Sequence, residues 1–382
     1  MMKTKLKLCA ACLLVLGAVL AHQTTAAEQS SKAAARPLTP TLLLTLPDYV
    51  ATPAGLAADT HGNLVVACPN FTDKAKPACL VRIDKRMRVT KWVDLPVLSE
   101  TGVACPMGIA FGPDGDLYVC DNQGWTGSEK GQSKGRVLRL RIRDNAIASM
   151  TVVAEGMEHP KGVRVRRQGI YVTQSLMTKA RHPSGLPVSA LYRFPTDGRN
   201  IKVSNTLDDK NLLAMFLTEN KFCPYGADGI AADSKGNLYV GIFGDGKVHK
   251  VVLDGSGGVK NNTVLAKTDF NYALDPKSAD FLAKATLSKM RTVSGLWADS
   301  GDSVYAADFS NNAVVKISSK GDAIVLAQNA DTDGRSGELN QPADVVVWED
   351  MLVISNFDIL FGPDKVNTKH GLPATLSALK LK

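Results

Sequence analysis

The chain contains 382 residues, of which 45% are hydrophobic and 21% charged, as is typical of a globular protein. Its formal charge of +8 falls to +5 when Lys3, Lys5 and Lys7 are set aside, an excess too small to indicate a nucleic-acid partner. Beyond residue 21, every apolar run is interrupted before it reaches the roughly 18 residues that a membrane helix needs, so no later membrane span is predicted.

The N-terminus is typical of a cleaved export signal. The three lysines precede an apolar run over residues 8–21, and small residues suited to cleavage follow at Ala21 and Ala27. We therefore predict a signal peptide over residues 1–27 and a periplasmic or secreted mature protein that does not contact a membrane. Residues 28–40, rich in Ala, Ser, Lys and Pro, are predicted to be a flexible tether.

An internal repeat organises the remainder of the chain, residues 41–382, which we predict to be a single domain. Six segments share a small residue and a glycine, an alternating apolar strand, a tight Asp/Gly/Asn turn, and a second strand rich in Leu, Tyr and Val. Their near-even spacing predicts an all-β, six-bladed β-propeller rather than a β-sandwich, because sandwiches seldom repeat a motif at 50 residues or more. The equivalent positions are Gly55, Gly108, Gly162, Gly229, Gly295 and Asp344.

The last repeat runs out of chain after its third strand. We predict that residues 41–46, with the sequence TLLLTL, supply the missing outer strand. This pairing would join the two ends of the chain in one blade and remove the edges that an open sheet presents.

Long connections are predicted to gather on one face of the propeller. The connections from strand one to two and from strand three to four are short, whereas the long ones follow strand two or join successive blades. Long loops that share a face commonly carry function. Two of these segments, residues 208–222 and 275–290, have helical spacing with acidic starts and basic ends, and we predict short lid helices there.

Cysteine usage fits an oxidising compartment. Cys68 and Cys79 lie at the two ends of one strand connection, and Cys105 and Cys120 flank the first two strands of blade two, so two disulfides are predicted. Cys223 is left over, and we interpret it as an inert thiol.

The stretch YGADGIAADSKGNLYVGIFGDGKVHKVVLDGSG, which begins at Tyr225, resembles the corresponding blade of the regucalcin/gluconolactonase family. The general pattern of the other blades is similar, and it is shared with NHL-repeat, paraoxonase-like and strictosidine-synthase-like propellers. The resemblance implies a calcium or zinc ion at the mouth of the central channel, held by a Glu, Asn residues and an Asp at the starts of inner strands. That ion would polarise a lactone carbonyl and activate water.

The ligand set that the resemblance implies is mostly missing. Asp228 matches the family's Asp, but Ala54 stands where the Glu is expected, and Met107 and Lys161 stand at the Asn positions. One carboxylate does not hold a cation that prefers six or more oxygens, so no cofactor is predicted with certainty. A metal would need other oxygen ligands to move into the role, for which the candidates are Asp121, Asp308, Asp344 and Asn356.

The charges suggest a different use of the same positions. Lys161 and Asp228 are predicted to face each other at the channel mouth, either as a structural ion pair or as part of a site for a small anionic or lactone ligand. The candidate catalytic residues are then Asp228, Lys161 and His159, and the further ligand-binding candidates are Tyr225, Asp121, Asn122, Asp308, Asp344 and Asn356. Two functions stay open: hydrolysis of lactones or related cyclic esters, and ligand or protein binding without catalysis.

Overall fold

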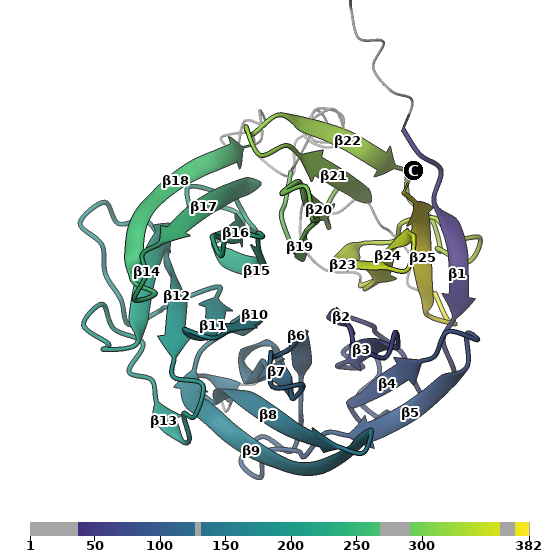
Figure 1. The fold of residues 1–382 in the computed structure, drawn as a ribbon, viewed down its shortest axis with the longest axis horizontal. Coiled ribbons are helices and arrows are strands. Elements are labelled where there is room, and N and C mark those ends of the chain that lie inside the picture. Colours follow the sequence, from purple (N-terminus) through teal and green to yellow (C-terminus); the bar gives the residue numbers. More distant parts are fainter. Residues whose placement is uncertain (1–36, 127–130, 268–290, 360–370, 382) are drawn as a thin grey trace, which may run out of the picture. The chain divides into compact units, whose positions relative to one another are not determined.

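The computed structural model describes residues 37–126, 131–267, 291–359 and 371–381. These residues form six antiparallel sheets around a central axis, with the first strand of each sheet next to the axis (Figure 1). The predicted six-bladed β-propeller is therefore confirmed. In the described part of the chain, the only helix is a short 3-10 turn, η1 (Gln123–Thr126), and no helix is long and apolar enough to cross a membrane.

The first three blades follow one another along the chain. Blade one contains β2 (Leu56–Ala58), β3 (Leu64–Cys68), β4 (Cys79–Ile83) and β5 (Val89–Asp94). Blade two contains β6 (Pro106–Phe111), β7 (Leu117–Asp121), β8 (Gly135–Arg143) and β9 (Ala146–Met157), with β13 (Ile201–Lys202) added in parallel to its edge. Blade three contains β10 (Pro160–Arg166), β11 (Gly169–Gln174), β12 (Val188–Phe194) and β14 (Leu212–Leu217).

The last three blades complete the ring. Blade four contains β15 (Ala227–Ala232), β16 (Leu238–Ile242), β17 (Lys247–Leu253) and β18 (Val259–Lys267). Blade five contains β19 (Leu296–Ala298), β20 (Val304–Asp308), β21 (Ala313–Ile317) and β22 (Ala323–Gln328). Blade six contains β23 (Pro342–Trp348), β24 (Met351–Asn356), β25 (Thr375–Lys380) and β1 (Thr41–Thr45).

The ring closes as the sequence predicts. Strand β1 pairs antiparallel with β25, from Thr41 opposite Ala378 to Thr45 opposite Thr375, and is the outer strand of blade six. The following residue, Leu46, is buried and its N–H donates to the carbonyl of Ala374 at 2.8 Å. The fold begins slightly before this strand, because the N–H of Leu38 donates to the carbonyl of Leu326 in β22. The predicted tether, residues 28–40, therefore ends inside the described fold, whereas the predicted signal peptide lies outside the described residues.

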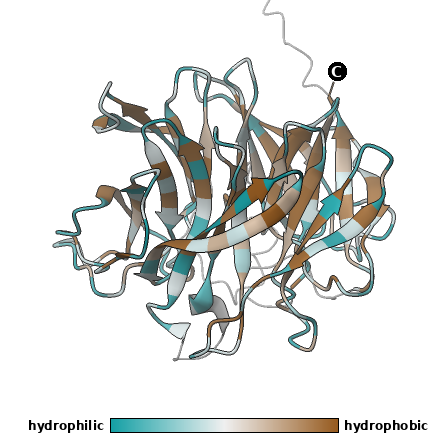
Figure 2. Ribbon diagram, turned by 60° about the horizontal axis from the view of Figure 1, so that its bottom comes forward, coloured by the Kyte–Doolittle hydropathy of each residue, from teal (hydrophilic) through white to brown (hydrophobic). Residues whose placement is uncertain are grey.

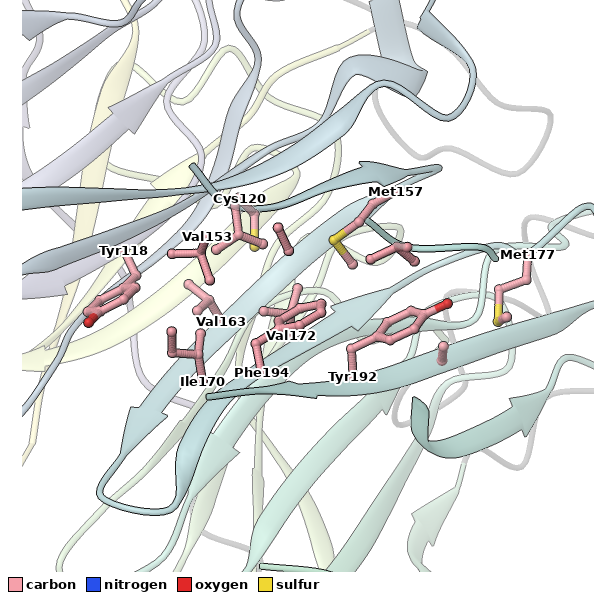
Figure 3. Close-up of a cluster of buried hydrophobic side chains, with 14 of the residues drawn as sticks. Tyr118, Cys120, Val153, Met157, Val163, Ile170, Val172, Met177, Tyr192 and Phe194 are labelled. Carbon is pink, nitrogen blue, oxygen red and sulfur yellow. The ribbon is translucent and has the colours of Figure 1, made fainter. Parts of the chain in front are cut away.

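Hydrophobic cores lie between neighbouring blades. Between blades two and three, Tyr118, Cys120 and Val153 belong to one cluster with Val163 and Phe194, all with 0 or 1% of their surface exposed (Figure 3). Hydrophobic residues are frequent along the strands, and the connecting loops are mostly hydrophilic (Figure 2). Successive side chains of a strand point to opposite faces of the sheet. Each blade therefore packs one face against the preceding blade and the other face against the following blade.

One predicted lid helix is wrong. Residues 208–222 contain the strand β14, which pairs with β12 as the outer strand of blade three. The acidic start does not cap a helix, because the Asp209 carboxylate accepts hydrogen bonds from the N–H groups of Ser204 and Asn211 in a turn. The connection from β12 to β14 is consequently long, contrary to the expectation that all such connections are short. The second predicted lid helix, residues 275–290, lies outside the described residues.

Candidate functional site

Six equivalent residues, one before each repeat glycine or its replacement, surround the channel at one mouth. We call them the channel ring: Ala54, Met107, Lys161, Asp228, Ser294 and Ala343. In blades two, three, four and six the pairing of the first two strands shifts at this position, and such bulges re-aim side chains.

Close contact between neighbouring blades explains why glycine follows the ring residue. A Cβ at Gly229 would lie 2.0 Å from the carbonyl oxygen of Ser294, and one at Gly162 would lie 2.6 Å from that of Asp228. Only glycine lets the backbones approach this closely. The repeat glycine therefore brings each ring residue next to that of the following blade.

The ring residues of blades three, four and five form a polar half. Lys161 Nζ lies 3.0 Å from Asp228 Oδ1 and 3.4 Å from Ser294 Oγ, and the Ser294 hydroxyl donates to the same carboxylate oxygen at 3.3 Å. The Lys161 side chain is 9% exposed and that of Asp228 is 1% exposed. Burial raises the pKa of Asp228, and the neighbouring ammonium and hydroxyl partly offset this rise. The structure thus brings together the predicted Lys161 and Asp228.

The ring residues of blades six, one and two form an apolar half. Ala343, Ala54 and Met107 are buried in one cluster with Cys105, Phe357 and Ile359, against which Phe71 and Phe309 pack. This half contains no charged side chain among its described ring positions. These apolar side chains favour contact with apolar groups over contact with hydrated ones.

His159 and Tyr225 lie in the segments that lead into the inner strands of blades three and four. Their ring centroids are 5.6 Å apart in an edge-to-face arrangement. His159 precedes Lys161 by two residues, and Tyr225 precedes Asp228 by three, so both lie just before the inner strands β10 and β15. Burial lowers the pKa of His159 to about 4, so its imidazole is neutral at pH 7. A neutral imidazole in such a place is able to accept a proton.

Three of the predicted ligand-binding residues have structural hydrogen bonds instead of facing the ring. Asp121, Asp308 and Asn356 occupy equivalent positions at the ends of β7, β20 and β24 and are at most 2% exposed. Each accepts a hydrogen bond from a backbone N–H of the segment that enters the inner strand of the same blade, at 2.6 to 3.0 Å. Asp121 is also paired with Arg136 at 2.6 Å. These hydrogen bonds hold the segment that enters each inner strand against the second strand of the same blade.

Asp344 replaces the sixth glycine and faces the channel. Its Oδ2 accepts from the N–H of Leu56 in blade one at 2.9 Å, and it attracts the guanidinium of Arg164. Burial raises the pKa of Asp344, and Arg164 opposes that rise. The cavity that these side chains line, together with Lys161 and Asp228, has a volume of about 20 Å³. It has room for about one water molecule.

The described residues do not fit a calcium or zinc site. They contain no group of three or more His, Cys, Asp or Glu side chains that could hold a metal ion. The Asp228 carboxylate already accepts a hydrogen bond from an ammonium, and the alternative oxygen ligands accept hydrogen bonds from backbone N–H groups. Lys161 puts a positive charge at the place where the resemblance implies a cation.

The predicted cysteine pairs differ in their geometry. Cys68 and Cys79 lie directly opposite each other in β3 and β4, both fully buried in one core cluster, as two thiols. Burial raises the pKa of Cys68, whereas the hydrogen bond from Cys68 lowers that of Cys79. Cys105 lies opposite Asn122 rather than Cys120, and these two thiols belong to different clusters. The structure therefore gives no support to the predicted bridge between Cys105 and Cys120.

Sequence reasoning missed several residues of this mouth. Ser294 stands at an aligned ring position, but a search for ion ligands does not select a serine. The phenylalanines follow second strands, where the repeat is irregular. A comparison of the residue after each second strand would have found Phe243, Phe309 and Phe357.

No sequence profile of a known protein family matches this chain, and no curated protein matches it. Solved structures do match. The aldose sugar dehydrogenase of Streptomyces coelicolor, solved with bound PQQ, is 18% identical over 90% of this chain and 98% of its own, with a TM-score of 0.53. The calcium-binding protein regucalcin of Agrobacterium tumefaciens is 13% identical over 91% and 96%, with a TM-score of 0.52. A gluconolactonase of Xanthomonas campestris is 14% identical over 91% and 97%, with a TM-score of 0.50.

These similarities confirm the resemblance to regucalcin and gluconolactonase propellers at the level of the fold. A sugar dehydrogenase shares that fold to the same degree. Since one fold serves different reactions, the function has to be argued from the channel mouth itself.

Proposed function

We propose that this protein binds lactones or related cyclic esters at the channel mouth and hydrolyses them without a divalent cation. The observation that carries this proposal is the buried Lys161 ammonium, held 3.0 Å from Asp228 at the ring position where the resemblance implies a metal ligand. A fixed positive charge of this kind stabilises the negative charge that develops on a carbonyl oxygen during ester hydrolysis. Similarity in fold to a gluconolactonase supports this choice of substrate class.

Each residue of the polar half has a place in the reaction. Asp228 and Ser294 orient the Lys161 ammonium, which lies against the carbonyl oxygen of the ester. A water molecule attacks the carbonyl carbon and gives a proton to neutral His159, the ring C–O bond breaks, and the leaving alkoxide takes that proton. The product is an open-chain hydroxy acid, whose carboxylate forms beside the same ammonium.

A second function, ligand binding without hydrolysis, is favoured by one observation. Lys161, Asp228 and Ser294 form hydrogen bonds with one another, as the members of a purely structural cluster would. In that case the mouth would bind the lactone or its hydroxy acid and release it unchanged. Calorimetric binding with no turnover would identify this function.

The decisive experiment measures hydrolysis of a panel of small lactones and aryl esters by the full chain in the presence of a chelator. We expect turnover to persist in chelator and to fall by about a hundredfold in the double variant Lys161→Met with Asp228→Asn, which leaves no unpaired buried charge. The matched control is Lys202→Met, which removes the exposed pair with Glu155. Unchanged turnover in the double variant, or a requirement for calcium, would refute the proposal.

A further inference from the structure

A second set of equivalent positions is the residue that follows the second strand of each blade, next to the segment that leads into the inner strand. Blades four, five and six have Phe243, Phe309 and Phe357 there, and blade one has Phe71 nearby in the segment after β3. The rings of Phe243 and Phe309 have centroids 5.8 Å apart, those of Phe309 and Phe357 are 6.0 Å apart, and those of Phe71 and Phe357 are 6.4 Å apart. Four blades therefore contribute to one continuous aromatic wall.

The two remaining blades have polar residues at the same position. Asn122 in blade two and Ser175 in blade three are both 0% exposed. Neither the amide of Asn122 nor the hydroxyl of Ser175 has a hydrogen-bond partner among the described residues. The backbone of Ser175 bonds to His159 on one side and to Gly226, next to Tyr225, on the other, so this polar side adjoins the proposed catalytic group.

Unsatisfied buried polar groups are costly, and a ligand that pairs with them recovers this cost. The amide nitrogen of Asn122 and the hydroxyl of Ser175 can donate to the two oxygens of an ester or a carboxylate, which only accept, and the amide oxygen of Asn122 can accept from a water molecule. The aromatic wall suits a ring or an alkyl chain, whereas the hydroxyl groups of a sugar would lose water there without gaining partners. The cavity among the ring residues has room for about one water molecule, so we place the ligand between the aromatic wall and the polar side.

We propose that the ligand is a lactone or carboxylic ester that carries an aryl or short alkyl substituent, and not a polyhydroxylated sugar lactone. The acyl oxygens lie toward Asn122, Ser175 and Lys161, and the substituent lies against Phe309 and its neighbours. This inference rests on the proposed function for the reaction, but the preference for an apolar substituent follows from the aromatic wall alone.

The test compares γ-phenyl-γ-butyrolactone with glucono-δ-lactone, using the full chain and measuring both turnover and calorimetric binding of the two hydroxy-acid products. We expect kcat/KM for the phenyl lactone to be at least about tenfold higher, and the phenyl hydroxy acid to bind at least about tenfold more tightly. Phe309→Leu, which keeps an apolar side chain in place, should lower both preferences about three- to tenfold. Ile324→Ala, at a position 52% exposed on β22, is the control and should change neither preference.

The outcomes separate the two proposals. Phe309-dependent binding of the phenyl hydroxy acid without any turnover would support the aromatic site and refute hydrolysis. Faster turnover of glucono-δ-lactone, or preferences that Phe309→Leu leaves unchanged, would refute the aromatic site while hydrolysis stands.

Discussion

The two halves of the channel ring fill equivalent positions with different kinds of side chain, apolar in one half and polar in the other. In the apolar half, Ala343, Ala54 and Met107 fill the space beside the channel and pack under phenylalanines. In the polar half, Lys161, Asp228 and Ser294 fill the equivalent space with charges and a hydroxyl that must satisfy one another. Since apolar residues suffice at three of six equivalent positions, the fold does not require the buried charges. The polar half is therefore the part of the ring where a function is to be sought.

Removal of β1 should have the largest effect, because it opens the blade on which the apolar half depends. Deletion of residues 41–46 removes the strand partner of β25 and the buried Leu46. We expect the free energy of unfolding to fall by at least about 5 kcal/mol, enough to unfold a domain of ordinary stability. Deletion of residues 28–36 is the control and should change little. Urea unfolding measures both, and an unaffected transition after loss of residues 41–46 would contradict the closure.

Breaking the polar half should have the next largest effect. Lys161→Met leaves the Asp228 carboxylate buried without its ammonium, which should cost about 3–5 kcal/mol. Adding Asp228→Asn should recover much of this loss, because no buried charge then remains. The exposed pair of Lys202 and Glu155 gives the comparison, where Lys202→Met should cost at most about 1 kcal/mol. Additive costs in the double variant would show that the two residues do not depend on each other.

The sequence predicted the fold well because the repeat glycine recurs at five of the six blade contacts, where the backbones approach closely. The same alignment placed Lys161 and Asp228 together, since the residue before each glycine must meet that of the next blade. The strand β14 was predicted as a helix because the run LLAMFL has apolar residues at the spacing of a helix and also at that of a strand. Only its pairing with β12 decides between the two. The aromatic wall was missed because its members lie in connections, where side-chain direction depends on how each strand ends.

A disulfide between Cys68 and Cys79 would stabilise blade one, which belongs to the apolar half, whereas no such bond is predicted in the polar half. These residues bracket the segment that carries Phe71, and they lie directly opposite each other. We expect a disulfide in exported protein that stabilises the fold by about 3 kcal/mol, as loop closure of this length predicts. Thermal unfolding with and without reductant measures it, with Cys68→Ser plus Cys79→Ser as a control that should not respond. Free thiols at both positions in protein purified from the medium or periplasm would rule it out.

Acid should affect the polar half through His159. Burial lowers its pKa to about 4 in the folded state, whereas an unfolded histidine titrates near 6.5. The unfolded chain therefore binds this proton first, and stability should fall by about 2 kcal/mol as pH decreases from about 6.5 to 4. Turnover should fall only as pH approaches 4, when the folded imidazole itself becomes charged. His159→Gln should remove this part of the pH dependence, and the control His61→Gln should not. Identical pH profiles for the wild type and both variants would show that His159 does not cause the pH dependence.

The central claim is that Lys161 replaces a divalent cation at the channel mouth, and metal content tests it most directly. The protein is dialysed against calcium or zinc, separated from free metal, and measured by elemental analysis beside Asp228→Asn. We expect both proteins to retain far less than one ion per chain, because one carboxylate already paired with an ammonium is a poor ligand. One calcium or zinc ion per chain in the wild type, lost in Asp228→Asn, would contradict the account and indicate a metal-dependent site.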